Sequence, residues 1–258
     1  MSKIKNELAN DQQMPLRHSC EHVLHTAMQI LYPTLKKVMG PPIEDGYYLD
    51  FDLDEKVTPD NFPKIEELMR KIIKADLDIK KLEVSEEKAK EIFKNNQYKL
   101  ATIDEIIERR EKITLYSIGE EGNQYYDLDL CGGPHVKSTG EVKAFKLLSV
   151  AGAYYKGSEK NKMLSRIYGT AFASQKELAA YLWKLEEAKK RDHKRLGKEL
   201  EMFMFHETSP GMAYWLPKGV KMYNELVNFW RIEHEKRGYQ EIVSPLINKK
   251  ELYETSGH

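Results

Sequence analysis

The segment HSCEH, residues 18–22, places two histidines four positions apart. On a helix, residues four apart lie on the same side, so the imidazoles of His18 and His22 would point in one direction. Such a pair can form half of a metal site or hold a water molecule. Because a histidine pair alone is more often the solvated edge of a helix, a second group of donors is needed to indicate a site.

A second group of donors occurs in DLCGGPH, residues 129–135. The segment ends a predicted strand, and its Gly-Gly-Pro turn can bend sharply enough to bring Cys131 and His135 together. With the two helix histidines they supply four donors, which suit tetrahedral zinc or a held and activated water. Two plainer interpretations stay open, since His135 could bond a backbone carbonyl and Cys131 could be a small core residue.

The same five residues, HSCEH, also fit H-x-x-E-H, the signature of inverted zinc peptidases. In that interpretation Glu21 would be the general base. Nothing else in the sequence supports peptidase action, and so short a motif arises readily by chance.

The elements that would position these donors form an α+β pattern. Apolar residues recur at intervals of three and four from Leu16 to Leu31, which predicts a core-facing helix, and His18, His22 and His25 lie along an adjoining stripe. Strands and helices then follow without the regular alternation of a parallel α/β fold. They are a turn and strand over 40–53, a helix over 58–75, a strand over 77–84, a helix from Ser85, and strands over 113–118, 124–130, 142–150 and 163–173.

A change of pattern at Ser174 predicts a second region. Ser174 and Glu177 form a capping box that opens a helix reaching about Phe205. The segment TSPGM breaks the chain, and a second unit is expected to begin near Ala213. The chain ends soon after a further predicted helix begins, which indicates a truncated domain. Before that helix we predict a strand at YWLP, a helix over 218–236 stopped by Gly238, and a strand over 239–247.

The composition is that of an ordinary globular protein. The 258 residues contain 41 lysines and arginines and 41 aspartates and glutamates, so no net charge indicates a polyanionic partner, and any contact with nucleic acid must be local. Both cysteines lie in the histidine motifs and the N-terminus lacks the apolar core of a signal peptide, which favours a reducing, cytoplasmic location. No stretch approaches the roughly 18 apolar residues of a membrane span.

Several segments together resemble the threonyl-tRNA synthetase family. HSCEH (18–22), GYYLDFD (46–52), YDLDLCGGPHV (126–136) and GAYYKGSEKNKMLSRIYGTAF (152–172) resemble its editing domain. RDHKRLGKELEMF, SPGMAYWLPKG and KRGYQEIVSPLI resemble its linker and the entry to its class II core, with Pro245 as the proline of motif 1. The resemblance implies a flexible segment (1–15), an editing domain with an antiparallel sheet and packed helices (16–173), a linker helix (174–206) and the start of a class II antiparallel-sheet catalytic domain (207–258).

The resemblance also implies an activity. The full-length enzyme would attach threonine to tRNA(Thr) with ATP and Mg, as a homodimer, and its editing domain would hydrolyse seryl-tRNA(Thr) formed in error. Zinc stays open, because the similar domain of alanyl-tRNA synthetases binds zinc with this donor set, whereas the threonyl version is thought to work without it. The residues implied are His18, His22, Cys131 and His135 for catalysis or zinc, Lys99, Asp129 and Tyr48 for substrate, and Lys190, Arg191, Lys194 and Arg195 for tRNA phosphates.

Three features depart from the family's pattern. The N-terminal ubiquitin-like domain of bacterial members is missing, and the chain ends before motifs 2 and 3, whose arginines bind ATP, so this polypeptide is not expected to aminoacylate. Leu49 stands where the family has tyrosine, in the wall that faces adenosine.

The basic stretch could also be a solvated helix face. Two other functions stay open: a non-catalytic, zinc-stabilised RNA-binding module, and a stand-alone trans-editing aminoacyl-tRNA hydrolase.

Overall fold

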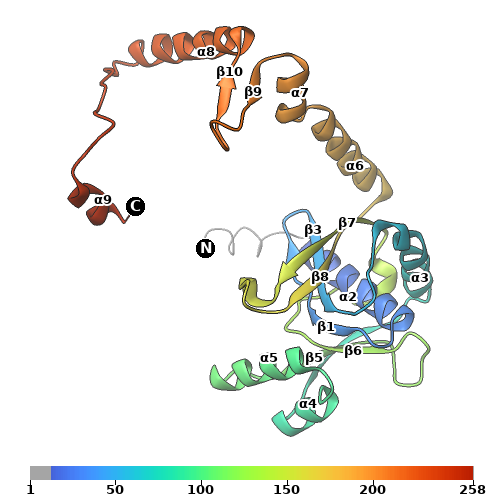
Figure 1. Ribbon diagram of the computed structural model, residues 1–258. Helices are drawn as coiled ribbons and strands as arrows, with labels where there is room; N and C mark the ends of the chain where they lie inside the picture. Colours follow the sequence, from blue (N-terminus) through green and yellow to red (C-terminus); the bar gives the residue numbers. More distant parts are fainter. Residues whose placement is uncertain (1–12, 258) are drawn as a thin grey trace. The chain divides into compact units, whose positions relative to one another are not determined.

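The computed structural model describes residues 13–257 (Figure 1). They form a mixed α/β fold with antiparallel sheets, as the sequence predicts. The chain divides into two compact units, of which the first ends at Trp183 and the second begins at Lys184. Most of the predicted flexible segment 1–15 lies outside the described residues, but Met14 and Pro15 already belong to helix α2.

The larger sheet of the first unit has the strand order β1-β3-β8-β7, and β2 pairs with β3 at one end. Its central strand β3 shows why this segment is a buried strand, since Tyr47, Leu49 and Phe51 alternate along it and are at most 1% exposed. All pairings are antiparallel. The strands are β1 (Lys36–Met39), β2 (Pro42–Ile43), β3 (Gly46–Asp52), β7 (Ala144–Tyr154) and β8 (Met163–Phe172).

Two helices, α2 (Met14–Leu31) and α3 (Phe62–Lys74), pack with this sheet around the main core. The apolar face of α2 is buried as its periodicity predicts, and Pro15 starts the helix in its first turn, where a proline costs no hydrogen bond. The predicted helix over 58–75 is confirmed, although it opens with a short 3₁₀ turn, Pro59–Asn61. Because nearly all of α2 is buried, its polar residues must find partners inside the unit.

A smaller antiparallel sheet has the order β4-β5-β6, with strands Ile79–Glu83, Thr114–Ile118 and Asp127–Leu130. Ser85 begins the next helix as predicted, but two helices follow it, α4 (Glu86–Ile92) and α5 (Gln97–Glu108). Asn96 separates them. Its side-chain oxygen accepts from the backbone N–H groups of Tyr98 and Lys99, and its amide donates to the carbonyl of Lys37 on β1.

Two expectations for the residues after Ser174 are wrong. The helix predicted to run from Ser174 to about Phe205 is not continuous: α6 (Gln175–Lys190) ends, Asp192 caps a new helix α7 (His193–Glu199), and residues 203–205 are strand β9. The strand predicted over 239–247 is absent, and that stretch is irregular. The short strand β10 (Ala213–Trp215), the helix α8 (Pro217–Glu235) and the stop at Gly238, with φ of 77°, agree with prediction, and a last helix, α9 (Lys250–Ser256), follows.

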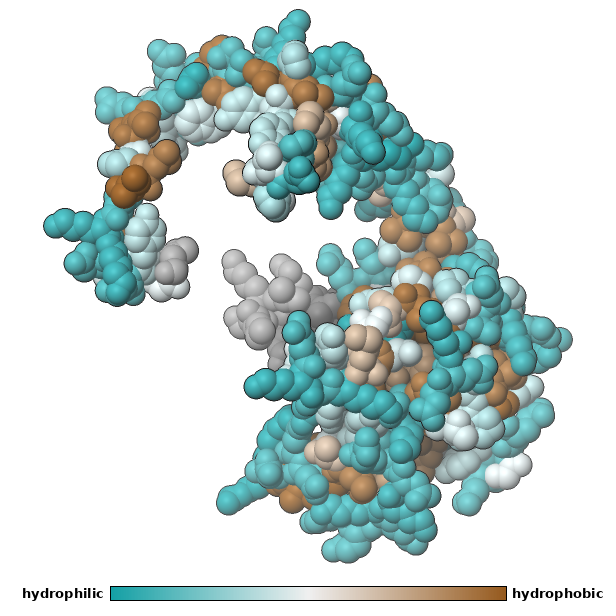
Figure 2. Space-filling model, in the orientation of Figure 1, coloured by the Kyte–Doolittle hydropathy of each residue, from teal (hydrophilic) through white to brown (hydrophobic). Residues whose placement is uncertain are grey.

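Hydrophobic side chains are exposed along this second unit, as the brown areas over its helices and its irregular stretch show (Figure 2). Leu226, Phe229 and Trp230 of α8 are each about half exposed or more. In the irregular stretch, Ile242, Val243, Leu246 and Ile247 are 86–96% exposed. A strand needs a neighbour for its backbone groups, and 239–247 pairs with no other strand among residues 13–257.

Candidate functional site

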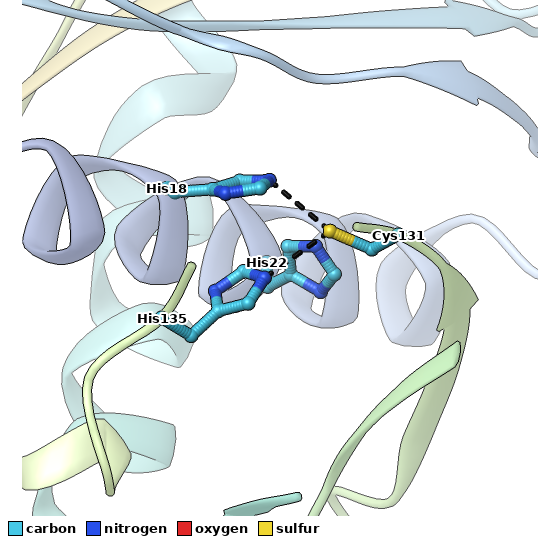
Figure 3. Close-up of side chains that lie close together, drawn as sticks. All are labelled: His18, His22, Cys131 and His135. Atoms are coloured by element: carbon cyan, nitrogen blue, oxygen red, sulfur yellow. Dashed lines mark hydrogen bonds between the residues drawn. The ribbon is translucent and has the colours of Figure 1, made fainter. Parts of the chain in front are cut away.

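Helix α2 places His18 and His22 side by side, as the spacing predicts. Their ring centroids are 5.4 Å apart, and both side chains point to the same side of the helix (Figure 3). Both residues are buried, at 9% and 2% exposed. The interpretation of this histidine pair as the solvated edge of a helix is therefore wrong.

The loop after β6 brings Cys131 and His135 against these histidines. Gly133 makes this loop possible, because its φ is +73° and a Cβ there would collide with the hydroxyl of Tyr116. The ring of His135 lies 4.1 Å from that of His18 and 4.5 Å from that of His22, centroid to centroid. Helix and loop, far apart in sequence, thus meet at one place.

The thiol of Cys131 is the centre of the cluster. Its sulfur lies 3.3 Å from Nε2 of His18 and 3.2 Å from Nε2 of His135 (Figure 3). One donor atom from each of His18, His22, Cys131 and His135 falls within 4.8 Å of all the others. The expected convergence of the two motifs is observed.

A cleft of about 380 Å³ opens beside the cluster. Lys99 and Asp129, two residues expected to bind substrate, are in its wall as a buried ion pair, with Nζ 2.8 Å and 2.9 Å from the two carboxylate oxygens. Among the described residues, the lining is His18, Glu21, His22, Cys131, Lys99, Asp129, Met14, Val38, Met39, Gly40, Pro41, Pro42, Thr102, Leu130, Gly132 and Gly133.

Tyr48, the third residue expected to bind substrate, is not brought into this cleft. Its neighbours Tyr47 and Leu49 on β3 face the core, so the ring of Tyr48 lies on the other face of the sheet. There the guanidinium of Arg166 stacks over it, 3.8 Å from the ring centroid. Tyr48 reaches the cleft only through its backbone N–H, which donates to the carbonyl of Pro41, a lining residue.

Burial controls the protonation of the cluster. It lowers the pKa of His18 to about 4 and also lowers the pKa values of His22 and His135 well below the usual range. Burial raises the pKa of the Cys131 thiol to about 12. Without a metal, the four groups are therefore neutral at pH 7.

Glu21 is a buried carboxyl in the same wall. Its pKa is raised well above the usual range, first by burial and then by the charge of Asp129. One carboxylate oxygen lies 3.8 Å from Nε2 of His22. Gly40 packs against it so closely that a Cβ at position 40 would overlap the Glu21 side chain.

The donor set fits zinc. Tetrahedral zinc with bonds of about 2.3 Å to sulfur and about 2.0 Å to nitrogen separates these atoms by about 3.5 Å. The observed sulfur–nitrogen distances of 3.2 and 3.3 Å require shifts of only a few tenths of an ångström, whereas the donors that are farthest apart, within 4.8 Å, would have to move closer. A metal bound here would need Cys131 as thiolate, whereas the metal-free cluster holds it as a thiol between two rings.

Three further contacts were not anticipated from the sequence. Ser19, fully buried on α2, contacts Nδ1 of His135 at 3.0 Å. Lys37 on β1 pairs with Asp127, two residues before Asp129. His25 is not part of the cluster but lies buried beyond His22, with Nδ1 3.6 Å and 3.5 Å from carboxylate oxygens of Asp127 and Asp129. No sequence spacing identifies such partners, because the contacts join segments about 100 residues apart.

The basic residues expected to contact tRNA belong to the second unit and are exposed. Lys190 and Arg191, at the end of α6, both pair with Glu187, at 2.9 and 3.1 Å. In α7, Arg195 lies 3.4 Å from Glu199. These pairs within helices are typical of a solvated surface, so the geometry does not distinguish a tRNA contact from that alternative.

The loop that carries Cys131 and His135 lies in a segment that matches a known protein family. Residues 113–168, which include β5, β6 and the Cys131 loop, match the second additional domain of threonyl and alanyl tRNA synthetases. The chain is 50% identical over 244 residues to a threonine–tRNA ligase of Desulforamulus reducens, 94% of this chain and 37% of that protein. The resemblance to threonyl-tRNA synthetases is confirmed.

Other threonine–tRNA ligases are equally similar. Identity is 51% over 246 residues to that of Thermotoga neapolitana and 49% over 245 residues to that of Clostridium tetani. In each case the match covers 94% of this chain and 37% of the relative. The chain thus spans little more than a third of these threonyl-tRNA synthetases, and it covers the editing-domain region. No helix among residues 13–257 is both long and apolar enough to cross a membrane.

Proposed function

We propose that the first unit is the post-transfer editing site of a threonine–tRNA ligase, which hydrolyses seryl-tRNA(Thr). The observation that carries this proposal is the meeting of His18, His22, Cys131 and His135 beside a cleft walled by the Lys99–Asp129 pair. The similarity to threonine–tRNA ligases supplies the substrate class. The proposal places the enzyme in the cytoplasm, where tRNA is charged.

The energetics explain why such a site is needed. Serine is threonine without one methyl group, and the loss of one methyl from a binding pocket discriminates by only about 10 to 200-fold. Translation requires greater accuracy. A second site that hydrolyses the wrong ester after transfer supplies the missing factor.

The reaction is attack of water on the ester carbon at the 3′ end of tRNA. Nδ1 of His18 donates to the carbonyl of Pro134, 3.1 Å away, so Nε2 carries the lone pair and can take a proton from the attacking water. The carboxylate of Asp129 would bind the ammonium group of the serine ester, and Lys99 would donate to the ribose oxygens. The ester bond then breaks, and the ribose oxygen leaves with a proton.

Zinc, where bound, would be held by His18, His22, Cys131 and His135 and would lower the pKa of a bound water. The remaining wall would keep its role, because Lys99 and Asp129 already form a pair that lies outside the four donors. Without a metal, the thiol of Cys131 is bonded between the rings of His18 and His135.

We further propose that residues 16–173 form the editing domain, 174–206 the linker and 207–258 the start of the class II catalytic domain. The whole enzyme would use ATP, Mg and threonine, bind tRNA(Thr) and act as a homodimer. In this proposal the irregular stretch 239–247, with its exposed aliphatic side chains, corresponds to motif 1. Lys190, Arg191, Lys194 and Arg195 would contact tRNA phosphates.

The test is deacylation of seryl-tRNA(Thr) and threonyl-tRNA(Thr) by the purified chain. We expect preferential hydrolysis of the seryl ester and a loss of about 10² to 10⁴-fold in His18→Ala and Cys131→Ala. His206→Ala, an exposed histidine of the second unit, is the matched control.

The second candidate is a zinc-stabilised RNA-binding module, which the four-donor cluster favours. Stoichiometric zinc in the purified protein, together with unchanged ester hydrolysis in His22→Ala and Cys131→Ala, would exclude the editing site and favour this function.

A further inference from the structure

Ser19 lies between His18 and Cys20 on α2 and is completely buried. Its hydroxyl oxygen has two partners, both on the Cys131 loop. The backbone N–H of Val136 donates to it at 3.0 Å, and Nδ1 of His135 lies 3.0 Å away. Ser19 therefore joins the helix to the loop at the outer nitrogen of His135.

The donor and the acceptor of the Ser19–His135 bond can be derived from the contacts of His18 at the other end of the cluster. A carbonyl oxygen only accepts, so Nδ1 of His18, which contacts Pro134, must carry a hydrogen. Nε2 of His18 is then an acceptor, and it faces the sulfur of Cys131 at 3.3 Å. The one hydrogen of the neutral thiol consequently points to His18.

The sulfur must then accept from His135, whose Nε2 is 3.2 Å away. Nε2 of His135 therefore carries the hydrogen of that ring, and its Nδ1 is an acceptor. Ser19 completes the series, because its oxygen accepts from Val136 and its own hydrogen donates to Nδ1 of His135.

The opposite arrangement leaves atoms without partners. If Nδ1–H of His135 donated to Ser19, the serine oxygen would accept twice and its hydrogen would need another acceptor. Within residues 13–257, the hydroxyl of Ser19 contacts no acceptor apart from His135. A buried hydroxyl without an acceptor is energetically costly, which favours the first arrangement.

We propose that Ser19 is a positioning residue that fixes His135 as the Nε2–H tautomer, opposite to the Nδ1–H tautomer that Pro134 fixes in His18. The two rings then present different groups at Nε2. His18 presents a lone pair that can accept a proton, and His135 presents an N–H that can donate a hydrogen bond. This division of roles rests on the proposed hydrolysis, whereas the tautomer assignment does not.

The chemistry balances with these two roles. The attacking water gives one proton to Nε2 of His18, and its oxygen forms the new bond to the ester carbon. When the carbon–ribose oxygen bond breaks, His18 returns that proton to the leaving oxygen, while Nε2–H of His135 can donate a hydrogen bond to the oxyanion. Both rings thereby end in their starting tautomers.

The experiment uses the whole chain, labelled with ¹⁵N-histidine and freed of metal with a chelator. Long-range ¹H–¹⁵N spectra of the imidazoles distinguish the two tautomers. We expect a single Nδ1–H form for His18 and a single Nε2–H form for His135. Finding His135 as Nδ1–H in the unmodified protein would overturn the proposal, and this result needs no variant to fold.

Ser19→Ala tests the cause. The variant should lose the single tautomer of His135 and show both forms, while His18, held by Pro134, keeps its own. Ser117→Ala removes another buried serine hydroxyl, outside the cluster, and should change neither ring. An unaltered His135 in Ser19→Ala would show that Ser19 does not set the tautomer.

Deacylation of seryl-tRNA(Thr) by the same samples separates the two proposals. The expected tautomers without hydrolysis would contradict the editing function and leave the role of Ser19 intact. Hydrolysis with His135 as the Nδ1–H tautomer would support the editing function and contradict the role of Ser19.

Discussion

Nδ1 of His18 donates to the carbonyl oxygen of Pro134 at 3.1 Å, across a sequence separation of 116 residues. This bond ties helix α2 to the loop that carries Cys131 and His135. The two residues after Pro134 add to it, since His135 and Val136 both contact Ser19. The cluster is thus held in place by its own polar contacts, which is the preorganisation that a hydrolytic site requires.

The close approach of Gly40 to Glu21 leads to a first prediction. Gly40→Ala should destabilise the protein by about 1 to 3 kcal/mol and reduce deacylation, because the new Cβ overlaps the buried carboxyl and must displace it. Chemical denaturation and seryl-tRNA deacylation are the measurements.

Gly132→Ala is the matched control, as a Cβ there meets no atom within 4 Å although Gly132 lines the same cleft. The double variant Glu21→Ala with Gly40→Ala should regain part of the lost stability. Equal effects of Gly40→Ala and Gly132→Ala would contradict the steric explanation.

The Lys99–Asp129 pair leads to a second prediction. Asp129→Asn leaves the buried ammonium of Lys99 without a counter-charge, so unfolding free energy should fall by about 3 to 5 kcal/mol, and hydrolysis should fall as well. Glu120→Gln breaks the exposed pair with Lys80 and should cost less than about 1 kcal/mol. Similar losses in the two variants would show that burial of the pair has no energetic consequence.

The lowered pKa of His18 gives a third prediction, for metal-free protein. The unfolded chain takes up this proton near pH 6.5 and the folded chain only near pH 4, so between these values the unfolded state binds more protons. Stability is therefore full above pH 6.5 and decreases as the pH falls, by about 3 kcal/mol for this residue at pH 4.

Denaturation curves at several pH values measure this slope. His18→Gln should have a shallower dependence between pH 6.5 and 4, although His22, His25 and His135 keep contributing in the same direction. Parallel curves for the two proteins would refute the assignment to His18.

A fourth prediction concerns zinc. Both rings must offer Nε2 lone pairs to a metal at the centre of the cluster, and His18 already does so. Zinc should therefore move the hydrogen of His135 from Nε2 to Nδ1, where Ser19 can accept it, and leave the tautomer of His18 unchanged. Imidazole ¹⁵N spectra before and after one equivalent of zinc test this. Bound zinc with His135 still protonated at Nε2 would be inconsistent with these ligands.

Much of the first unit could be predicted from its sequence, because its signals are local. The burial of α2 follows from apolar spacing, and Ser85 begins α4 because its side chain accepts from the N–H of Lys88. The pairing of the two histidine motifs needed the resemblance to a known family as well. Spacing alone only indicates that each motif has suitable donors.

The wrong predictions have identifiable causes. The linker pattern continues through residues 191–192, but Asp192 accepts from the backbone N–H of Arg195 and starts a new helix there. The stretch 239–247 has strand-forming residues, yet no described strand lies beside it. Strand β1 was missed because Lys36 and Lys37 look unlike a buried strand, and the partner that lets Lys37 be buried, Asp127, is 90 residues away.

The contacts of Asn96 imply a chemical vulnerability next to Lys99. Its amide group bonds to the carbonyl of Lys37 while its oxygen caps the helix that presents Lys99. Deamidation to aspartate would keep the cap and replace the N–H donor with a second oxygen, which repels that carbonyl. Deamidation of Asn96 during storage would therefore weaken the contact between β1, which carries the buried Lys37, and α5, which carries the buried Lys99. Stored preparations should lose hydrolytic activity before they lose helix content.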